Sequence, residues 1–297
     1  MIKSLIPTVR VDSKTSYHIA KAIHPPVIVV RVQDVISKKT GEPNSIFTEI
    51  VEAGGIHNFL NYEGFVILSL IMKDDLIWLF SSEKYAQIIN GLLPDAYTTV
   101  DGATYENREI FSERELIRLS KQTIELLHLC PHILPIGQVK GSTSRQIQMH
   151  LKLLENLGIE IFLFHTGDFL RQGDRNMIQK AKHFASLIKK KGHTLILSGM
   201  GAQRHLTSFS FADAFITYSH IVNAQHGKRF EGTRKIKSFG GKFVGTAIHN
   251  LKQMILNLKK IQTQTKLYSG GELLWAEAQQ EQSKELVILG QVEKIKV

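Results

Sequence analysis

The sequence predicts an α/β fold and, within that class, a single-domain (β/α)8 barrel of the TIM type. Short, nearly continuous apolar runs alternate with longer amphipathic segments, which is typical of a parallel sheet covered by helices on both faces. Eight such runs can be counted, and eight strands close a barrel. An open, doubly wound sheet is the alternative. The 297 residues, of which 43% are hydrophobic, are enough for one large core.

The expected strands are separated by segments with helical periodicity. In chain order, the apolar runs are residues 26–32, 64–71, 96–102, 133–141, 159–168, 193–201, 213–220 and 242–250. The helical segments 144–158 and 176–192 each end on a glycine, which is common just beyond the last turn of a helix. We therefore expect the barrel to span residues 1–269, followed by a C-terminal extension over residues 270–297 that contains one further candidate strand.

The composition of the chain limits which binding partners and which cellular compartment are expected. A formal net charge of +10 favours a polyanionic partner, nucleic acid first, although a generally basic surface would give the same balance. The single cysteine, Cys130, excludes an internal disulfide and a multi-cysteine zinc site. Residues 1–10 lack the apolar core of a signal peptide, and no run approaches the ~20 apolar residues of a membrane helix. We expect a cytoplasmic protein that binds no membrane.

One strand ending carries a candidate catalytic carboxylate. The alternating run 96–100 ends on Asp101-Gly102, and in a (β/α)8 barrel the carboxyl ends of the strands carry the chemistry. Aspartate before glycine is also common in turns, so a structural role is the alternative. The glycine-rich segment 198–204 (SGMGAQR) lacks the GxGxxG spacing of a dinucleotide site and is interpreted as a turn.

Six segments resemble, in the same order, segments of one enzyme family. GGIHNFLNYEGFVILS (54–69) is similar to GLHxFLxWDGPILTDS, PDAYTTVDGATY (94–105) to the strand with DECTPY, and LPIGQVKGST (134–143) to FGIxQGS. LILSGMG (195–201) is similar to YLMGVG, FADAFITYSHIVNAQHGKR (211–229) to GVDMFDCVLPTRNGRHG, and GTAIHNLKQMILNLKKI (245–261) to a last strand and helix with SxHNL. The family is the queuine/archaeosine tRNA-guanine transglycosylases, whose wider superfamily includes relatives that act on DNA. Its fold is also a (β/α)8 barrel.

The resemblance implies a base exchange and assigns candidate residues. Family members cut the N-glycosidic bond of a guanine in a nucleic acid and attach a free 7-deazaguanine base, without a cofactor. One Asp attacks C1′ to form a covalent intermediate, and a second Asp holds the purine and handles protons. The match to DECTPY gives the second role to Asp101. The residues expected to bind the base are Ser69, Gln138, Lys140, His165, Thr166, Gly167, Ser198 and Gly199.

The chain departs from the family at the nucleophile. An ungapped match places Ile216 where the attacking Asp should be, and Asp213, three residues earlier, is expected to be structural. Asp168, at the end of the preceding strand, is the candidate replacement.

It departs again at the zinc site. His249 matches one zinc ligand, but the loop that bears the family's three cysteines contains none, so we expect no metal and a His249 that packs near the end of the barrel. The replacing loop is basic and is the candidate for phosphate contacts, with a solvated loop as the alternative. The residues expected to bind nucleic acid are His226, Lys228, Arg229, Arg234, Lys235 and Lys237.

Three functions remain open at this level. The first is a base-exchange enzyme acting on DNA or tRNA, and the missing zinc loop favours a DNA-type relative. The second is a non-catalytic nucleic-acid-binding protein that supports a catalytic partner subunit, so that homo- or hetero-oligomers are expected. The third is an unrelated barrel enzyme whose segment 198–204 holds the phosphate of a small substrate.

Overall fold

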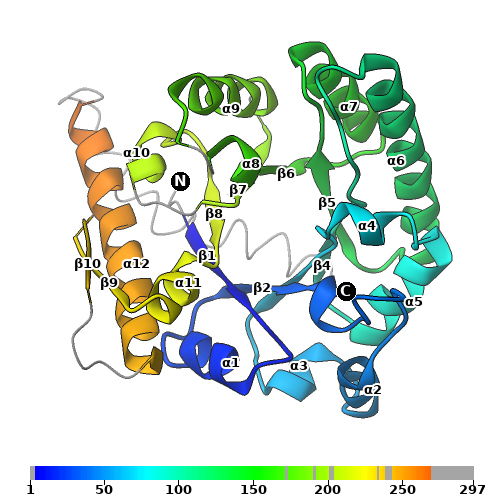
Figure 1. Ribbon diagram of the computed structural model, residues 1–297. Coiled ribbons are helices and arrows are strands. Elements are labelled where there is room, and N and C mark those ends of the chain that lie inside the picture. Colours follow the sequence, from blue (N-terminus) through cyan, green and yellow to red (C-terminus); the bar gives the residue numbers. More distant parts are fainter. Residues whose placement is uncertain are drawn as a thin grey trace.

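The protein is a closed barrel of eight parallel strands surrounded by helices, as the sequence predicts (Figure 1). The computed structural model describes residues 4–170, 173–189, 192–200, 204–232, 234–237 and 243–268. Each strand pairs with the next along the chain, and β8 pairs with β1 to close the barrel. The strands are β1 (Ser4–Val9), β2 (Val27–Arg31), β3 (Phe65–Ser69), β4 (Ala96–Thr98), β5 (Leu134–Val139), β6 (Ile161–His165), β7 (Thr194–Ser198) and β8 (Ala214–Thr217).

Helices follow the strands and form the outer ring. Those of the first half are α1 (Lys14–Lys21), α2 (Ser45–Glu52), α3 (Ile56–Leu60), α4 (Asp74–Ile77), α5 (Ser82–Leu92) and α6 (Glu109–Leu129), with a short 3-10 helix at Val32–Asp34. Those of the second half are α7 (Ser144–Asn156), α8 (Gly167–Leu170), α9 (Arg175–Ile188), α10 (Arg204–Ser208), α11 (Ser219–Gln225) and α12 (Phe243–Tyr268). None of the helices in the described ranges is both long and apolar enough to cross a membrane.

The number of strands is correct, but one predicted strand is wrong and one strand was missed. The first barrel strand is β1, which the apolar-run count missed because the run is short and contains Pro7. The run 242–250 was expected to be the eighth strand, and from Phe243 onward it is the start of α12 instead. Ala247, Leu251 and Met254 are buried at helical spacing. This period of three to four residues indicates a helix, although the segment begins with β-branched residues. The candidate strand in the extension lies outside the described residues.

The barrel interior is filled by one inward-facing residue set. Ile6, Val29, Ile67, Ile136 and Ile196 belong to a single buried cluster that draws on all eight strands. Because successive strand residues alternate between the two faces, residues two or four positions further along the same strands also face inward, at the carboxyl end. This alternation selects the side chains that line the mouth of the barrel.

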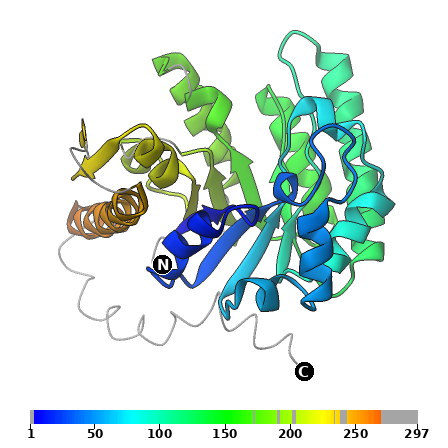
Figure 2. The same cartoon turned by 60° about the horizontal axis from the view of Figure 1, so that its bottom comes forward.

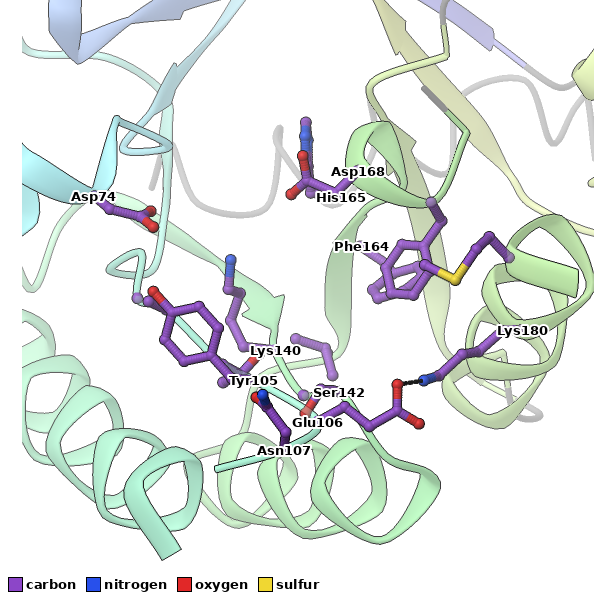
Figure 3. A pocket seen from close by; sticks show the side chains of 17 residues that line it. Asp74, Tyr105, Glu106, Asn107, Lys140, Ser142, Phe164, His165, Asp168 and Lys180 are labelled. Atoms are coloured by element: carbon purple, nitrogen blue, oxygen red, sulfur yellow. Dashed lines mark hydrogen bonds and ion pairs between the residues drawn. The ribbon is translucent and has the colours of Figure 1, made fainter. Parts of the chain in front are cut away.

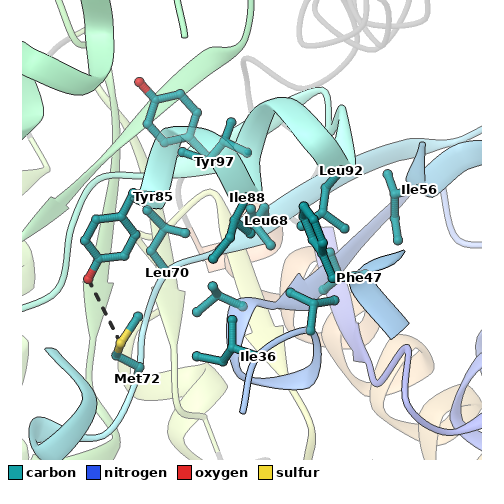
Figure 4. Packing of buried hydrophobic residues seen from close by; sticks show 14 of the residues in the cluster. Ile36, Phe47, Ile56, Leu68, Leu70, Met72, Tyr85, Ile88, Leu92 and Tyr97 are labelled. Carbon is teal, nitrogen blue, oxygen red and sulfur yellow. Dashed lines mark hydrogen bonds between the residues drawn. The ribbon is translucent and has the colours of Figure 1, made fainter. Parts of the chain in front are cut away.

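Larger apolar clusters lie between the strands and the helices. In one of them, Phe47, Leu68, Ile88 and Leu92 pack together, and the hydroxyl of Tyr85 lies 4.0 Å from the sulfur of Met72 (Figure 4). A second cluster joins the helices that cover β5 to β8. These clusters fix the strand ends from outside, so the loops that follow β4, β5 and β6 begin from a rigid base.

The basic loop forms a small antiparallel hairpin, β9 (Lys228–Glu231) and β10 (Arg234–Lys237). It packs on α12 and, in both views, lies on the opposite side of the barrel from α6 and α7 (Figures 1 and 2). Asn250 of α12 accepts a hydrogen bond from the amide of Phe230 and donates to the carbonyl of Lys228. His249 Nε2 lies 2.8 Å from the carbonyl of Phe230. The His-Asn pair therefore holds the hairpin.

Candidate active site at the carboxyl end of the barrel

Asp101 lies just beyond β4 and is the best-bonded side chain at this end of the barrel. Its Oδ1 accepts hydrogen bonds from Gln138 Nε2 at 2.7 Å, Lys140 Nζ at 2.8 Å and the amide of Gly102 at 2.9 Å. Its Oδ2 accepts from the amide of Met72 at 3.1 Å. Only 4% of the residue is exposed, so these donors replace the water that a carboxylate needs. Asp101 thus ties the ends of β3, β4 and β5 together.

Lys140 follows β5 and stands above this carboxylate. About a fifth of its side chain, 21%, is exposed, so it is the member of the pair that reaches solvent. Burial alone would lower the pKa of its amino group, but the carboxylates of Asp101, Asp168 and Asp74 together raise the pKa above its ordinary value. Lys140 is therefore an ammonium at neutral pH before any ligand binds, with three acidic side chains around it.

A cavity of about 330 Å³ opens at the ends of β4, β5 and β6 (Figure 3). Its polar wall contains Lys140, His165, Asp168 and Asp74. Figure 3 shows Lys140 and Asp74 on one side of the space and Asp168 with His165 on another. Its apolar wall is formed by Tyr105, Phe164, Phe169 and Met177. Glu106 and Lys180 form an ion pair of 2.6 Å at the rim, which connects the loop after β4 to α9. The volume and the mixed lining suit a small planar molecule.

The β6 and β7 ends are locked to each other beside the cavity. His165 Nδ1 lies 2.9 Å from Ser198 Oγ, and both the amide and the hydroxyl of Thr166 donate to the carbonyl of Ser198. Gly199 has a φ of +81°, and a Cβ placed there would lie 2.6 Å from the amide nitrogen of Gly167. A glycine is required at this position because the two loops approach so closely.

The structure brings three of the predicted site residues to the cavity wall: Lys140, His165 and Asp168. Asp101 and Gln138 lie beneath them, out of contact with the cavity, and act on it through Lys140. Thr166, Gly167, Ser198 and Gly199 join β6 to β7 behind His165. Ser69, at the end of β3, is buried and accepts a hydrogen bond from the amide of Ile71. All of them lie at the carboxyl end of the strands, as predicted.

The three positions considered for the nucleophile, Asp168, Asp213 and Ile216, lie in different parts of the barrel. Asp168 is exposed in α8 and lines the cavity. Ile216, at the position that matches the family's attacking Asp, is buried in the barrel interior. Asp213 precedes β8 at the opposite end of the barrel, where its Oδ2 accepts from Lys189 Nζ at 2.6 Å and from the amide of Leu195 at 2.7 Å. Asp213 therefore lies away from the cavity, and its structural role stays a prediction.

The residues present do not fit the family's zinc site. His249 is bonded to Phe230 through Nε2, and Cys130 is buried at the end of α6, where burial raises the pKa of its thiol to about 11. Over the described ranges, no three His, Cys, Asp or Glu side chains are grouped so that they could hold a metal ion.

Five of the six residues proposed for phosphate contacts lie on the hairpin, away from the cavity, and His226 lies just before it at the end of α11. His226, Lys228, Arg229, Arg234, Lys235 and Lys237 are all exposed. Arg229 forms an exposed ion pair with Glu231 at 3.3 Å, and Lys235 lies over the ring of Phe230. Since the hairpin and the β4–β6 edge are on opposite sides of the barrel, one ligand must be long to reach both (Figure 1).

Several wall residues were missed by the sequence analysis. Asp74 follows β3 within the segment KDD, and Tyr105 lies four residues after Asp101. The signal that could have identified both is that each lies only a few residues beyond the end of a strand. Phe169, Met177 and Lys180 come from α8 and α9 and had no signal beyond helical periodicity. No model of a known protein family matches this chain, and no curated protein matches it.

Proposed function

We propose that this protein exchanges a guanine in DNA or tRNA for a free 7-deazaguanine base at the β4–β6 cavity. The observation that carries the proposal is the position of Lys140, which is held by the buried Asp101 at the wall of a cavity that also contains the exposed carboxylate of Asp168. A carboxylate that can attack and an ammonium that can give and take a proton are the two groups that a glycosyl exchange needs. The resemblance to the tRNA-guanine transglycosylases supplies the identity of the base.

The wall of the cavity supports a planar heterocycle as the ligand. Tyr105, Phe164 and Phe169 offer aromatic surface, on which a base can stack. A guanine in a duplex would have to leave its stack to enter.

In the proposed first step, a carboxylate oxygen of Asp168 attacks C1′ of the target nucleotide. The C1′–N9 bond breaks, its electron pair leaves with the guanine, and the Lys140 ammonium donates the proton that neutralises the leaving base. In the second step, N9 of 7-deazaguanine attacks C1′ while its proton passes to the Lys140 amine. The bond to Asp168 breaks, and the carboxylate is regenerated. Asp101 keeps Lys140 in place throughout and is a positioning residue.

A second candidate function is supported by one observation, the isoleucine at position 216. Ile216 is buried inside the barrel, so the strand that bears the family's nucleophile offers no carboxylate here. A chain that binds nucleic acid and supports a catalytic partner subunit would retain the barrel and the basic surface without needing Asp168.

The test is formation of a covalent adduct. The wild-type protein, mixed with a guanine-containing DNA or tRNA, should give an adduct that survives denaturing gel electrophoresis, and labelled 7-deazaguanine should be incorporated. Asp168→Asn should form no adduct, because an amide does not attack C1′. Asp75→Asn is the matched control, since Asp75 is an exposed acid in α4 that does not line the cavity.

The remaining outcomes separate the two functions. If wild type and Asp168→Asn both form the adduct, another residue is the nucleophile and the assignment of Asp168 is wrong. If exchange occurs only when a catalytic homologue is added, the chain is the supporting subunit. If neither nucleic acid gives an adduct or exchange under any of these conditions, the base-exchange proposal is wrong.

A further inference from the structure

A second polar cluster lies at the mouth of the barrel, on the side formed by β8, β1 and β2. Arg10 follows β1, Arg31 ends β2, and Tyr218 follows β8; β1 pairs with both of the other strands. Residues 6, 29 and 216 of these strands face the barrel interior. By strand alternation Arg10, Arg31 and Tyr218 face inward too. They therefore lie around the same mouth as Lys140 and His165, across from the cavity.

Both guanidinium groups are held by a carboxylate of their own. Arg10 donates from Nε to Asp12 Oδ1 at 2.9 Å and from Nη2 to Asp12 Oδ2 at 2.5 Å. Arg31 binds Asp34 in the same way, from Nε to Oδ2 at 3.3 Å and from Nη2 to Oδ1. The side chain of Asp34 is only 1% exposed. The Nε–Nη2 edge of each arginine is thus occupied, and the Nη1 groups bind no carboxylate of the described residues. The arginine side chains remain 32% and 31% exposed.

Tyr218 joins the two pairs into one cluster. The guanidinium of Arg31 lies over the Tyr218 ring, 5.5 Å from its centroid. Burial raises the pKa of the Tyr218 hydroxyl, while Arg10 and Arg31 act to lower it. The cluster thus contains two guanidinium groups held by carboxylates and one phenol, all partly exposed at the carboxyl end of the strands.

We propose that Arg10, Arg31 and Tyr218 form an anion subsite that binds a phosphate group of the ligand whose base occupies the β4–β6 cavity. Planar guanidinium groups held in place by carboxylates lose little freedom when they bind phosphate oxygens, and their donors are charged. Because Asp12 and Asp34 balance the charges of the two arginines, the subsite has little net positive charge. It binds the phosphate through hydrogen bonds from the guanidinium groups. It rests on the proposed function for the molecule that carries the phosphate, either a nucleic-acid backbone or a free nucleotide.

The test compares two arginine variants that change the net charge equally. Arg10→Gln removes one donor group of the subsite, whereas Arg145→Gln removes a 72% exposed arginine of α7 that pairs with Glu109 and Glu113 of α6. The probes are a guanine-containing single-stranded oligonucleotide with hydroxyl ends, guanosine 5′-monophosphate, and guanosine, each measured by fluorescence anisotropy competition. Arg10→Gln should weaken the binding of a phosphate-bearing probe about tenfold, while guanosine binding is unchanged. Arg145→Gln should behave as wild type with all three.

The probe that responds identifies the source of the phosphate. A loss confined to the oligonucleotide assigns the subsite to a backbone phosphodiester, and a loss confined to the monophosphate assigns it to a free nucleotide. Tyr218→Phe, which keeps the ring under Arg31, should weaken the same probe by a smaller factor and covers the case in which Arg10→Gln does not fold. If neither variant differs from Arg145→Gln with either phosphate probe, the proposal is wrong. A wild type that forms no covalent adduct, but whose Arg10→Gln variant still loses phosphate binding, contradicts the base exchange and leaves the subsite intact.

Discussion

Asp101 and Asp213 are both nearly buried aspartates that hold a lysine, but they lie at opposite ends of the barrel strands. Asp101 binds Lys140 beside the cavity, and Asp213 binds Lys189 before β8 begins. Each carboxylate also accepts a hydrogen bond from a backbone amide of a neighbouring segment. The amide of Met72 donates to Asp101, and the amide of Leu195 donates to Asp213. The bonding is similar, so the difference in expected function comes from position alone, since in this fold chemistry occurs at the carboxyl ends.

Asp213→Asn should therefore act on stability. The amide removes the charge that Lys189 faces and weakens the acceptor that Lys189 Nζ and the amide of Leu195 share. We expect the free energy of unfolding to fall by about 2 kcal/mol, less than for a fully buried pair because Lys189 is 24% exposed. Urea denaturation followed by circular dichroism measures this, with the slope of the transition unchanged.

The matched control is Glu231→Gln, which breaks the exposed pair with Arg229. Its effect should stay below about 1 kcal/mol. A wild-type stability for Asp213→Asn together with a loss of nucleic-acid modification would contradict the structural role and place Asp213 in the chemistry.

At this scale, the structure bears on the predicted positions of the site residues, and their roles stay predictions. Lys140, His165 and Asp168 were expected at the site and do line the cavity, because each ends or follows a strand. Asp101 was expected to touch the base, yet the structure places it beneath Lys140. The network that covers it includes the amide of Met72, a residue that follows another strand. Periodicity cannot reveal such a contact, since it depends on how the strand ends meet in space.

Among the elements, β1 and α12 show what an apolar-run count can and cannot predict. The count reached eight because one missed strand and one false strand compensated. The barrel itself was predictable, since the strands β2 to β8 are apolar runs separated by helices. The start of α12 reads as a strand over nine residues and as a helix only over a longer window, where Ala247, Leu251, Met254 and Leu258 recur at three or four residues.

The β9–β10 hairpin replaces what the family resemblance suggested would be a metal-bound loop. Asn250 and His249 bind its backbone, so hydrogen bonds to α12 stabilise the hairpin. The hairpin bears five of the six residues expected to bind nucleic acid, and all of these are exposed. A solvated basic surface remains the alternative interpretation of the same residues.

A triple variant separates these interpretations. Changing Arg229, Arg234 and Lys237 together to Ala should weaken nucleic-acid binding for all sequences alike, because phosphate contacts carry no sequence information. The slope of log K against log salt should flatten by about 0.7 to 0.9 per lost contact. Fluorescence anisotropy titrations at four or more salt concentrations give the slope.

The control is Lys121→Ala combined with Lys252→Ala and Lys259→Ala, which removes the same charge from exposed positions on α6 and α12. It should alter the slope less than the hairpin variant does. An equal effect of the two sets means that only the net charge matters, and the hairpin is then a solvated surface.

For the molecule as a whole, two buried histidines make stability depend on pH. His150 lies behind Lys140 and accepts a hydrogen bond from its backbone amide at 3.0 Å, which requires a neutral Nδ1. Burial, with the charge of Lys140, lowers the pKa of His150 to about 4, and burial lowers that of His220 to about 3. Both values lie below the ~6.5 of an unfolded histidine, so between these limits the unfolded chain binds more protons. Stability is therefore complete above about pH 6.5 and falls as the pH decreases toward 4.

His150→Asn tests this at one of the two sites, because the asparagine carbonyl can still accept from the amide of Lys140 but does not titrate. Each histidine contributes a slope of up to about 1.4 kcal/mol per pH unit in this window. The variant should lose one such contribution between pH 4.5 and 6, as measured by urea denaturation at half-unit steps. The control is His24→Asn, at an exposed residue whose left-handed backbone (φ 49°) suits asparagine, and it should keep the wild-type slope. If His150→Asn keeps the wild-type slope as well, protonation of His150 does not limit the acid stability of the barrel, and the loss must come from groups other than the histidine behind the site.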